Sequence, residues 1–193
     1  MFHAEIISII AGGRSVRQVD QSRIPGLVIG VNDSFIHAEC DVCVSMDRLW
    51  TENRWTAIMY EEKPTYLRKA ALLNIHERTP LMFVYDCDIY ANEFSENWDN
   101  IGGNNSASCA MNFAYLARPL AIYLFGFDMT GSYWYPNYSW NPKPRRGLGH
   151  WVKQFDRARS QCDFQGIEVI NVSDVSLIKA FKTVTPKEFN SRR

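Results

Sequence analysis

Short apolar runs recur along the chain, and each of them stops at a small or polar residue. Six runs can be read from the sequence: Ile6 to Ile10, Leu27 to Val31, Val42 to Met46, Leu81 to Tyr85, Ile122 to Phe125 and Ile167 to Ile170. They lack polar alternation, which is typical of parallel strands that are covered on both faces. Nearly all are followed by Gly, Asn, Asp or Ser, and ligands of open parallel sheets bind outside the carboxyl ends of the strands. The pattern predicts an α/β fold with a ligand site beside these polar residues.

Helical stretches alternate with the runs, at Asp47 to Tyr60, Ser106 to Ala117 and Gly149 to Phe164. This alternation indicates a Rossmann-like, mostly parallel sheet flanked by helices. With 193 residues, the chain fits a single α/β domain over 1–193. The region 130–148 is rich in Tyr, Trp, Pro, Asn and Arg and has no helical or strand period, so it is expected to be a short aromatic lid or loop insertion.

Composition excludes several classes of protein. The chain has 21 basic residues (Lys and Arg) and 21 acidic residues (Asp and Glu), so its net charge is zero. This balance disfavours a protein that coats nucleic acid without sequence preference. No apolar run approaches the roughly 20 residues that span a bilayer. The start, MFHAEIISIIAGG, carries an acidic residue and no basic segment, unlike a signal peptide. We therefore expect a cytoplasmic protein without a membrane span.

Two glycine-rich junctions lie where a strand leads into a helical stretch. The first holds Gly12, Gly13 and Ser15, and the second leads through Gly102-Gly103 to Asn105 and Ser106. Glycines let backbone N–H groups approach a phosphate, and a helix start favours negative charge. A plain tight turn and an ordinary helix N-cap are the alternatives. Two such junctions on one sheet favour a nucleotide or another phosphate-bearing ligand.

Acidic residues and cysteines raise the question of metal binding. Asp86-Cys87-Asp88 resembles a DxD clamp, which together with Asp47 would hold Mg²⁺ or Mn²⁺ and a diphosphate. The favoured alternative is that these residues are solvated carboxylates at the ends of strands. Cys40 and Cys43 form a CxxC, but the intervening residues are typical of a strand interior. We therefore expect buried free thiols rather than zinc or a disulfide.

His150 stands at the predicted start of the last long helix. A helix N-terminus disfavours the protonated imidazole, which suits a neutral general base. On its position in the sequence alone, an exposed or capping histidine is the favoured alternative. Arg145, Arg146 and Trp151 belong to a basic and aromatic cluster around it, which fits a glycan or a nucleic-acid base.

These segments resemble a superfamily that contains the bacterial sialyltransferases of glycosyltransferase family 42, the MptE-like 6-hydroxymethylpterin diphosphokinases and uncharacterised phage and prophage proteins. The resemblance starts with Ile9-Ile10-Ala11-Gly12-Gly13-Arg14-Ser15 and Gly30-Val31-Asn32-Asp33-Ser34-Phe35. It continues with Asn105-Ser106-Ala107, the strand that ends in Gly126-Phe127-Asp128-Met129, and His150 before Gly166 to Asn171. It covers most of the chain.

The resemblance implies roles for individual residues. The phosphate and neighbouring groups of a nucleotide would be held by Gly12, Gly13, Ser15 and Asn32. The nucleotide or its sugar would be contacted by Asn105 and Ser106. Asp128 would lie near the nucleotide. His150 would be the general base, and lid tyrosines would stabilise the leaving phosphate: Tyr133, Tyr135 and Tyr138. Thr130 stands where those sialyltransferases carry a leaving-group tyrosine, and the lid is shorter, so the sugar need not be sialic acid.

The function expected from this resemblance is a nucleotide-sugar glycosyltransferase that works by single displacement and needs no metal cofactor. The alternatives are an ATP-dependent, Mg²⁺-requiring diphosphokinase of the MptE-like type and a non-catalytic phage accessory protein that binds a nucleotide or a protein. Expected partners are a nucleotide-sugar donor and an acceptor that is a glycan, a small molecule or a modified DNA base, with a homo-oligomer as an option. The expected compartment is the cytoplasm of a bacterium or of a phage-infected host.

Overall fold

The computed structural model describes residues 4–73, 75, 79–90, 93–131, 134 and 149–191. Within them lies one sheet of nine parallel strands in the order β6-β5-β4-β3-β2-β1-β7-β8-β9. The strands are β1 (Ile6–Ile10), β2 (Leu27–Val31), β3 (Val42–Ser45), β4 (Thr65–Arg68), β5 (Met82–Asp88), β6 (Asn100–Gly102), β7 (Ala121–Phe125), β8 (Glu168–Val172) and β9 (Lys182–Val184). The predicted α/β fold with a mostly parallel sheet is confirmed.

All six predicted strands are present, and three more were missed. The strand predicted to end at Tyr85 instead continues to Asp88, because β6 pairs with its last three residues. The missed strands β4, β6 and β9 are three or four residues long and carry polar residues, so no apolar run marks them. Their hydrogen-bonding partners on neighbouring strands define them as strands.

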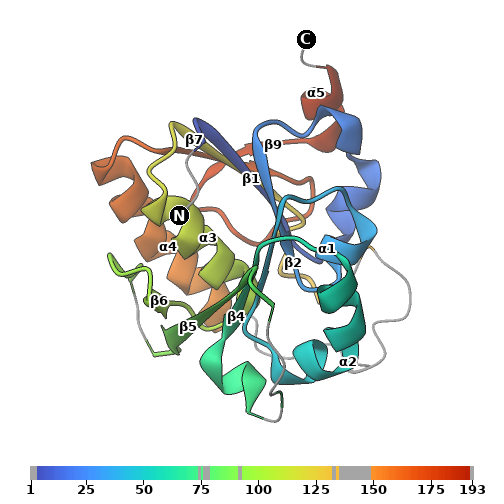
Figure 1. Cartoon of the computed structure of the whole chain (residues 1–193). Coiled ribbons are helices and arrows are strands. Elements are labelled where there is room, and N and C mark those ends of the chain that lie inside the picture. Colours follow the sequence, from blue (N-terminus) through green and yellow to red (C-terminus); the bar gives the residue numbers. More distant parts are fainter. Residues whose placement is uncertain are drawn as a thin grey trace.

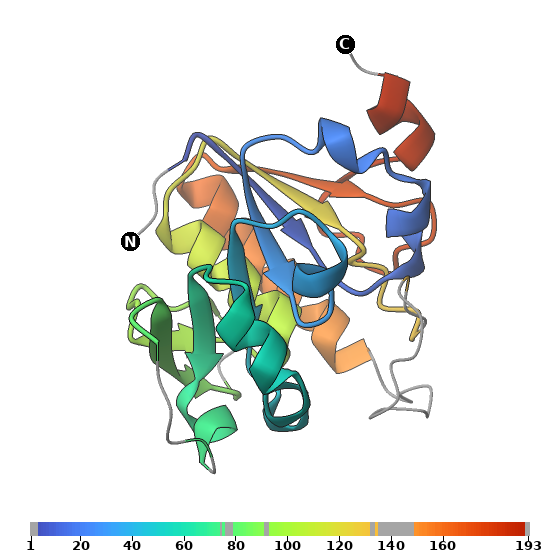
Figure 2. The same ribbon diagram turned by 45° about the vertical axis from the view of Figure 1, so that its right-hand side comes forward.

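Helices cover both faces of the sheet (Figure 1). One face carries α3 (Ser106–Leu116) and α4 (Gly149–Phe164); the other carries α1 (Ser34–His37), α2 (Arg48–Tyr60) and α5 (Pro186–Ser191), as the rotated view also shows (Figure 2). Two short 3-10 segments, η1 (Arg14–Gln18) and η3 (Lys69–Leu72), add buried residues to the second layer, whereas η2 (Gln21–Arg23) has none buried.

The helix α3 lies deepest in the molecule, since every one of its residues is buried. Its small side chains allow this close approach to the sheet, and Phe113 packs against Tyr66 and Tyr85 of neighbouring strands. The buried side chain of Asn112 accepts hydrogen bonds from the N–H groups of Ser95 and Gly102 at 2.8 Å each. This amide fixes the segment that leads into β6 against the helix.

The order of the strands creates a switch point between β1 and β7. From β1 the chain proceeds through β2 to β6 in one direction, and it then returns to the other side of β1 as β7, followed by β8 and β9. The connections that leave β1 and β7 therefore diverge from neighbouring strand ends, and ligands of such sheets bind in the crevice formed there. The loop after β1 (residues 11–15, the β1 loop) and the loop after β7 (residues 126–131, the β7 loop) lie at this switch point.

Four of the five cysteines are buried, as predicted, whereas Cys87 is half-buried. Cys40 and Cys43 are 4% and 0% exposed, all five cysteines are free, and Cys43 lies within β3 rather than in a redox turn. Burial raises the pKa of the Cys40 thiol to about 12. In the part of the chain that the structure describes, no helix is long and apolar enough to cross a bilayer.

Candidate functional site

Asp128 joins the loops at the switch point. Its fully buried carboxylate accepts hydrogen bonds from the N–H of Ser15 at 2.8 Å, the hydroxyl of Ser15 at 2.6 Å and the hydroxyl of Ser173 at 2.7 Å. Two of these donors belong to the β1 loop, and Ser173 directly follows β8. The structure thus brings the predicted residues Ser15 and Asp128 together, with Asp128 as the group that shapes the β1 loop.

Gly13 is required by packing within this arrangement. Its N–H donates to the carbonyl of Gly126 at 2.9 Å, and a Cβ at position 13 would lie 2.4 Å from that oxygen and 2.6 Å from the Asp128 carboxylate. A larger residue cannot fit without moving the backbone. At position 13, the absence of a side chain lets the β1 loop approach the β7 loop closely. The preceding Gly12 is half-exposed.

Asn32 has the features of a ligand-binding residue. It directly follows β2, and its backbone adopts a left-handed conformation with φ of 52°. Its Oδ1 atom is buried and has no hydrogen-bond partner among the described residues. Ile10 pairs with Gly30, so the parallel register places Asn32 beside Gly12 at the same edge of the sheet. A buried polar atom without a partner is costly, and a bound ligand would satisfy it.

The neighbouring Asp33 has a role that the sequence analysis missed. Its buried carboxylate receives a bidentate pair of bonds from Arg54 at 2.8 and 3.0 Å and a third from the indole N–H of Trp50 at 2.8 Å. This cluster fastens α2 to the end of β2 and holds Asn32 in place. Arg54 and Asp33 are 21 positions apart, so no local motif reveals their pairing.

One residue of the predicted lid lies on the β1 loop. The N–H of Trp134 donates to the carbonyl of Gly12 at 3.0 Å, and its indole N–H lies 3.2 Å from both the carbonyl of Ala11 and the hydroxyl of Ser34. The Nε of Arg17 in turn donates to the carbonyl of Trp134 at 2.9 Å. The predicted residues Tyr133, Tyr135 and Tyr138 lie outside the described residues, as do Arg145 and Arg146.

Asn105 and Ser106 stand at the start of α3, where they make structural contacts. Asn105 caps the helix by accepting the N–H of Ser108 at 3.0 Å, which is the alternative that the sequence left open. The Ser106 hydroxyl accepts the N–H of Met46 at 3.1 Å and so ties α3 to the end of β3. Both residues lie at the edge of the sheet that carries the strand carboxyl ends.

The helix α4 begins beside this junction. Gln154 accepts the N–H of Asn104 at 3.4 Å, and its buried Nε2 has no partner in the described part of the chain. His150 lies in the first turn of α4, as predicted. It precedes Gln154 by four residues, so the two positions lie on one side of the helix.

The three acidic candidates for metal binding do not converge. Asp86 lies within β5, is exposed and approaches Lys69 at 3.7 Å. Asp88, also in β5, accepts the N–H of Tyr90 at 2.9 Å. Asp47 caps α2 by accepting the N–H of Trp50 at 3.1 Å. Among the residues that the structure describes, no group of three or more His, Cys, Asp or Glu side chains is arranged to hold a metal ion.

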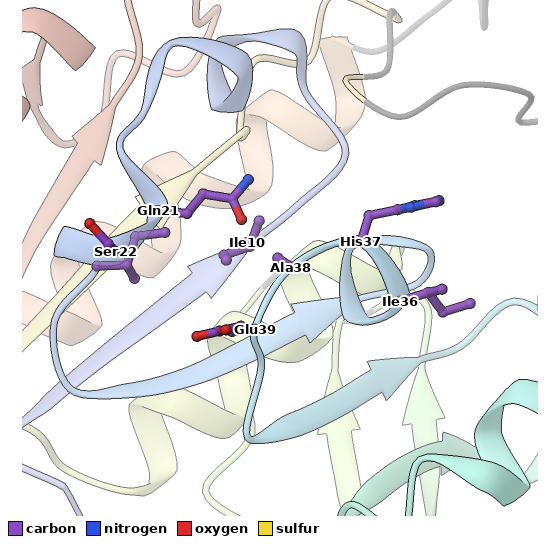
Figure 3. Close-up of a pocket in the computed structure, with 8 residues that line it drawn as sticks. Ile10, Gln21, Ser22, Ile36, His37, Ala38 and Glu39 are labelled. Carbon is purple, nitrogen blue, oxygen red and sulfur yellow. The ribbon is translucent and has the colours of Figure 1, made fainter.

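A separate open groove of about 470 Å³ lies on the face of the sheet that α1 covers (Figure 3). Gln21 and Ser22 of η2 and Glu39 after α1 surround it, and Ile10 at the end of β1 contributes an apolar side chain. The described residues that line it include none of the predicted site residues.

Comparison with known proteins places this arrangement in a known fold. Neither a protein-family model nor a curated protein matches the sequence. Among solved structures, the sialyltransferase CST-II in complex with a trisaccharide acceptor and CMP matches with a TM-score of 0.60 and 16% identity, over 97% of this chain and 88% of CST-II. A point variant of CST-II in complex with CMP matches with a TM-score of 0.59 and 14% identity, over 98% and 89% of the two chains. The resemblance to the family 42 sialyltransferases is thereby confirmed at the level of the fold, which this chain shares with CST-II over nearly its whole length.

Proposed function

We propose that this chain is a glycosyltransferase that binds a nucleotide sugar at the carboxyl ends of β1 and β2, beside Gly12 and Asn32. The fold is that of a protein solved with CMP and a trisaccharide, and the likeness covers nearly the whole chain. A pyrimidine nucleotide sugar is therefore the first donor to test. The proposal extends to the acceptor only as a class, namely a molecule that offers a hydroxyl group.

The observation that carries the proposal is the state of Asn32. Its left-handed backbone and its buried, unpartnered Oδ1 atom lie at a strand end beside the half-exposed Gly12. In the proposed complex, this oxygen accepts a hydrogen bond from the nucleotide, and the exposed Arg14 at the start of η1 supplies positive charge near the phosphate. The Asp128 contacts keep the β1 loop in the shape that this binding needs.

In the proposed reaction, His150 removes the proton from the acceptor hydroxyl as the oxygen attacks the anomeric carbon. The bond between that carbon and the phosphate oxygen breaks in the same step, so the configuration inverts. Tyr133, Tyr135 or Tyr138 would donate hydrogen bonds to the departing phosphate, which carries the growing negative charge. Two observations support this role for His150. It lies in the first turn of α4. Gln154, four residues later on the same helix, contacts Asn104 in the loop before α3.

The decisive experiment compares Asn32→Gly with the wild type in calorimetric titrations with CMP, UMP, GDP and ADP. Glycine keeps the left-handed backbone and removes only the amide, so the fold should persist while nucleotide affinity falls at least ten-fold. Glu62→Gly is a matched control, because Glu62 also has a left-handed backbone (φ of 48°) and follows α2 at the opposite edge of the sheet. Failure of the wild type to bind any of the four nucleotides would contradict the proposal.

A second measurement separates this reaction from the diphosphokinase alternative. Release of CMP from a CMP-sugar in the presence of a hydroxyl acceptor should survive EDTA, because the proposed mechanism uses no metal ion. Turnover of ATP that depends on Mg²⁺, with no release of CMP, would instead favour diphosphate transfer.

A further inference from the structure

Two cysteines that the proposed reaction does not use lie next to each other. The Sγ atom of Cys87 in β5 is 3.6 Å from the Sγ atom of Cys109 in α3, although the residues are 22 positions apart. Cys87 also donates to the carbonyl of Gly103 at 3.0 Å, and Cys109 approaches the Sδ atom of Met46 at 3.8 Å. Gly103 leaves room for the pair, because a Cβ at that position would lie 2.9 Å from the Cys109 sulfur.

The two thiols differ in accessibility and acidity. Cys109 is fully buried, whereas Cys87 is half-buried and lies on the sheet near the edge that β6 forms. The hydrogen bond from Cys109 lowers the pKa of Cys87, and nearby Arg68 lowers it further, against the opposing effects of burial and Asp88. The same contact and burial raise the pKa of Cys109. Cys87 is thus the more accessible and the more acidic thiol of the two, whereas Cys109 is shielded from a soluble oxidant.

We propose that Cys87 and Cys109 are a redox-active pair that forms a reversible intramolecular disulfide between β5 and α3. The Cys87 thiolate attacks a small disulfide such as oxidised glutathione, forms a mixed disulfide and releases one glutathione thiolate. Cys109 loses its proton to the released thiolate and attacks the Cys87 sulfur, which expels the second glutathione. Two protein thiols are oxidised, and one glutathione disulfide is reduced to two thiols. The sulfur atoms, which are 3.6 Å apart in the reduced chain, must close to about 2.05 Å when the bond forms.

This inference does not depend on the proposed glycosyl transfer. The pair lies behind the Gly102–Ser106 junction, because Cys87 contacts Gly103 and Cys109 lies in the first turn of α3. The disulfide would therefore fasten the start of α3 to β5 and restrain this junction.

The test incubates the reduced, folded full-length chain with oxidised glutathione. Samples are quenched with acid, blocked with N-ethylmaleimide and mapped by mass spectrometry. A peptide that links Cys87 to Cys109 should form at least ten-fold faster than any link through Cys40, Cys43 or Cys162, and dithiothreitol should reverse it. In 8 M urea this selectivity should disappear, because only the folded chain holds the two sulfurs together.

Two variants identify the order of attack. Cys109→Ser keeps a hydrogen-bond donor beside Cys87 and should accumulate the mixed disulfide of Cys87 with glutathione. Cys87→Ser should form neither a mixed disulfide nor a link at position 109. Cys162→Ala is the matched control, because Cys162 is also buried in a helix and should leave formation of the disulfide unchanged. Glutathione that remains on Cys87 in the folded wild type without transfer to Cys109 would overturn the proposal. An unreactive Cys87 in folded Cys109→Ser would overturn it as well.

Discussion

Asp128 lies in the β7 loop and acts on a loop that is more than a hundred positions away in the sequence. Its buried carboxylate accepts three hydrogen bonds, two of them from Ser15. Hydrogen bonds to an ionised group are stronger than neutral ones, and buried donors that lose their partner are costly. The shape of the β1 loop, and with it the half-exposed Gly12, therefore depends on this one side chain.

Asp128→Asn should lower the free energy of unfolding by about 2–3 kcal/mol, because an amide removes the charge and places a donor against other donors. Urea unfolding followed by circular dichroism measures this loss. Asp174→Asn makes the same change at an exposed residue whose carboxylate accepts a bond from Gln18 at 3.3 Å, and it should cost under about 0.5 kcal/mol. Equal losses in the two variants would argue against the role given to Asp128.

His150 carries the chemical part of the proposed function. If it is the general base, His150→Ala should reduce turnover by roughly 10²–10⁴-fold, the usual contribution of acid–base catalysis. Nucleotide affinity should change little, since the imidazole would act on the acceptor. Lys153→Ala, at an exposed position in the same helix, serves as the control for helix stability. A loss of thermal stability with unchanged turnover per folded molecule would mean that His150 is structural.

At the scale of elements, α2 is held to the sheet by one ion pair as well as by apolar packing. Arg54 forms a bidentate pair with Asp33, whose side chain is completely buried, and Trp50 donates to the same carboxylate. Removal of one partner from a buried pair leaves the other charge without compensation. The position of α2 and of the turn that contains Asn32 therefore depends on this pair.

Arg54→Met should destabilise the fold by about 3 kcal/mol, because methionine keeps much of the side-chain volume but leaves Asp33 uncompensated. Arg48→Met provides the comparison on the same helix, since Arg48 is exposed and approaches Glu52 at 3.7 Å. Exposed pairs of this kind contribute about 0–1 kcal/mol. The prediction fails if chemical denaturation gives the two variants the same stability.

At the scale of the whole molecule, buried thiols limit stability at high pH. Burial raises the pKa of Cys40 and of Cys162 to about 12, and it raises the pKa of Cys43 and Tyr85 well above their usual values. The unfolded chain releases the thiol protons near pH 9, whereas the folded chain retains them. The stability that these groups contribute is therefore complete below about pH 9 and is lost as the pH rises towards 12.

Urea unfolding under reducing conditions should show a stability that falls between pH 9 and 11, by up to about 1.4 kcal/mol per pH unit for each buried group. Cys162→Ala should give a shallower slope, because one of these groups is absent. A wild-type stability that stays constant from pH 8 to 11 would show that the buried thiols ionise as readily in the folded chain as in the unfolded one.

Local patterns were sufficient to predict much of the molecule. The strands at Ile6–Ile10 and Leu27–Val31 and the helix at Gly149–Phe164 have the predicted bounds, because short apolar runs and helical spacing are properties of neighbouring residues. The parallel direction followed from runs that are apolar on both faces. The glycine-rich β1 loop could be located from the sequence for the same reason, since it directly follows an apolar run.

The sequence by itself determined six of the nine described strands, the three long helices, the α/β class and the edge of the sheet where polar residues gather. Only the tertiary structure decided that β4 is a strand, since its hydrogen bonds come from β3 and β5. It alone showed that Gly13 is packed against Asp128, that Asp33 is paired with Arg54, and that Cys87 lies beside Cys109. The physical reason is the same in each case: these contacts join residues far apart in the chain, and their partners become neighbours only when the sheet has formed.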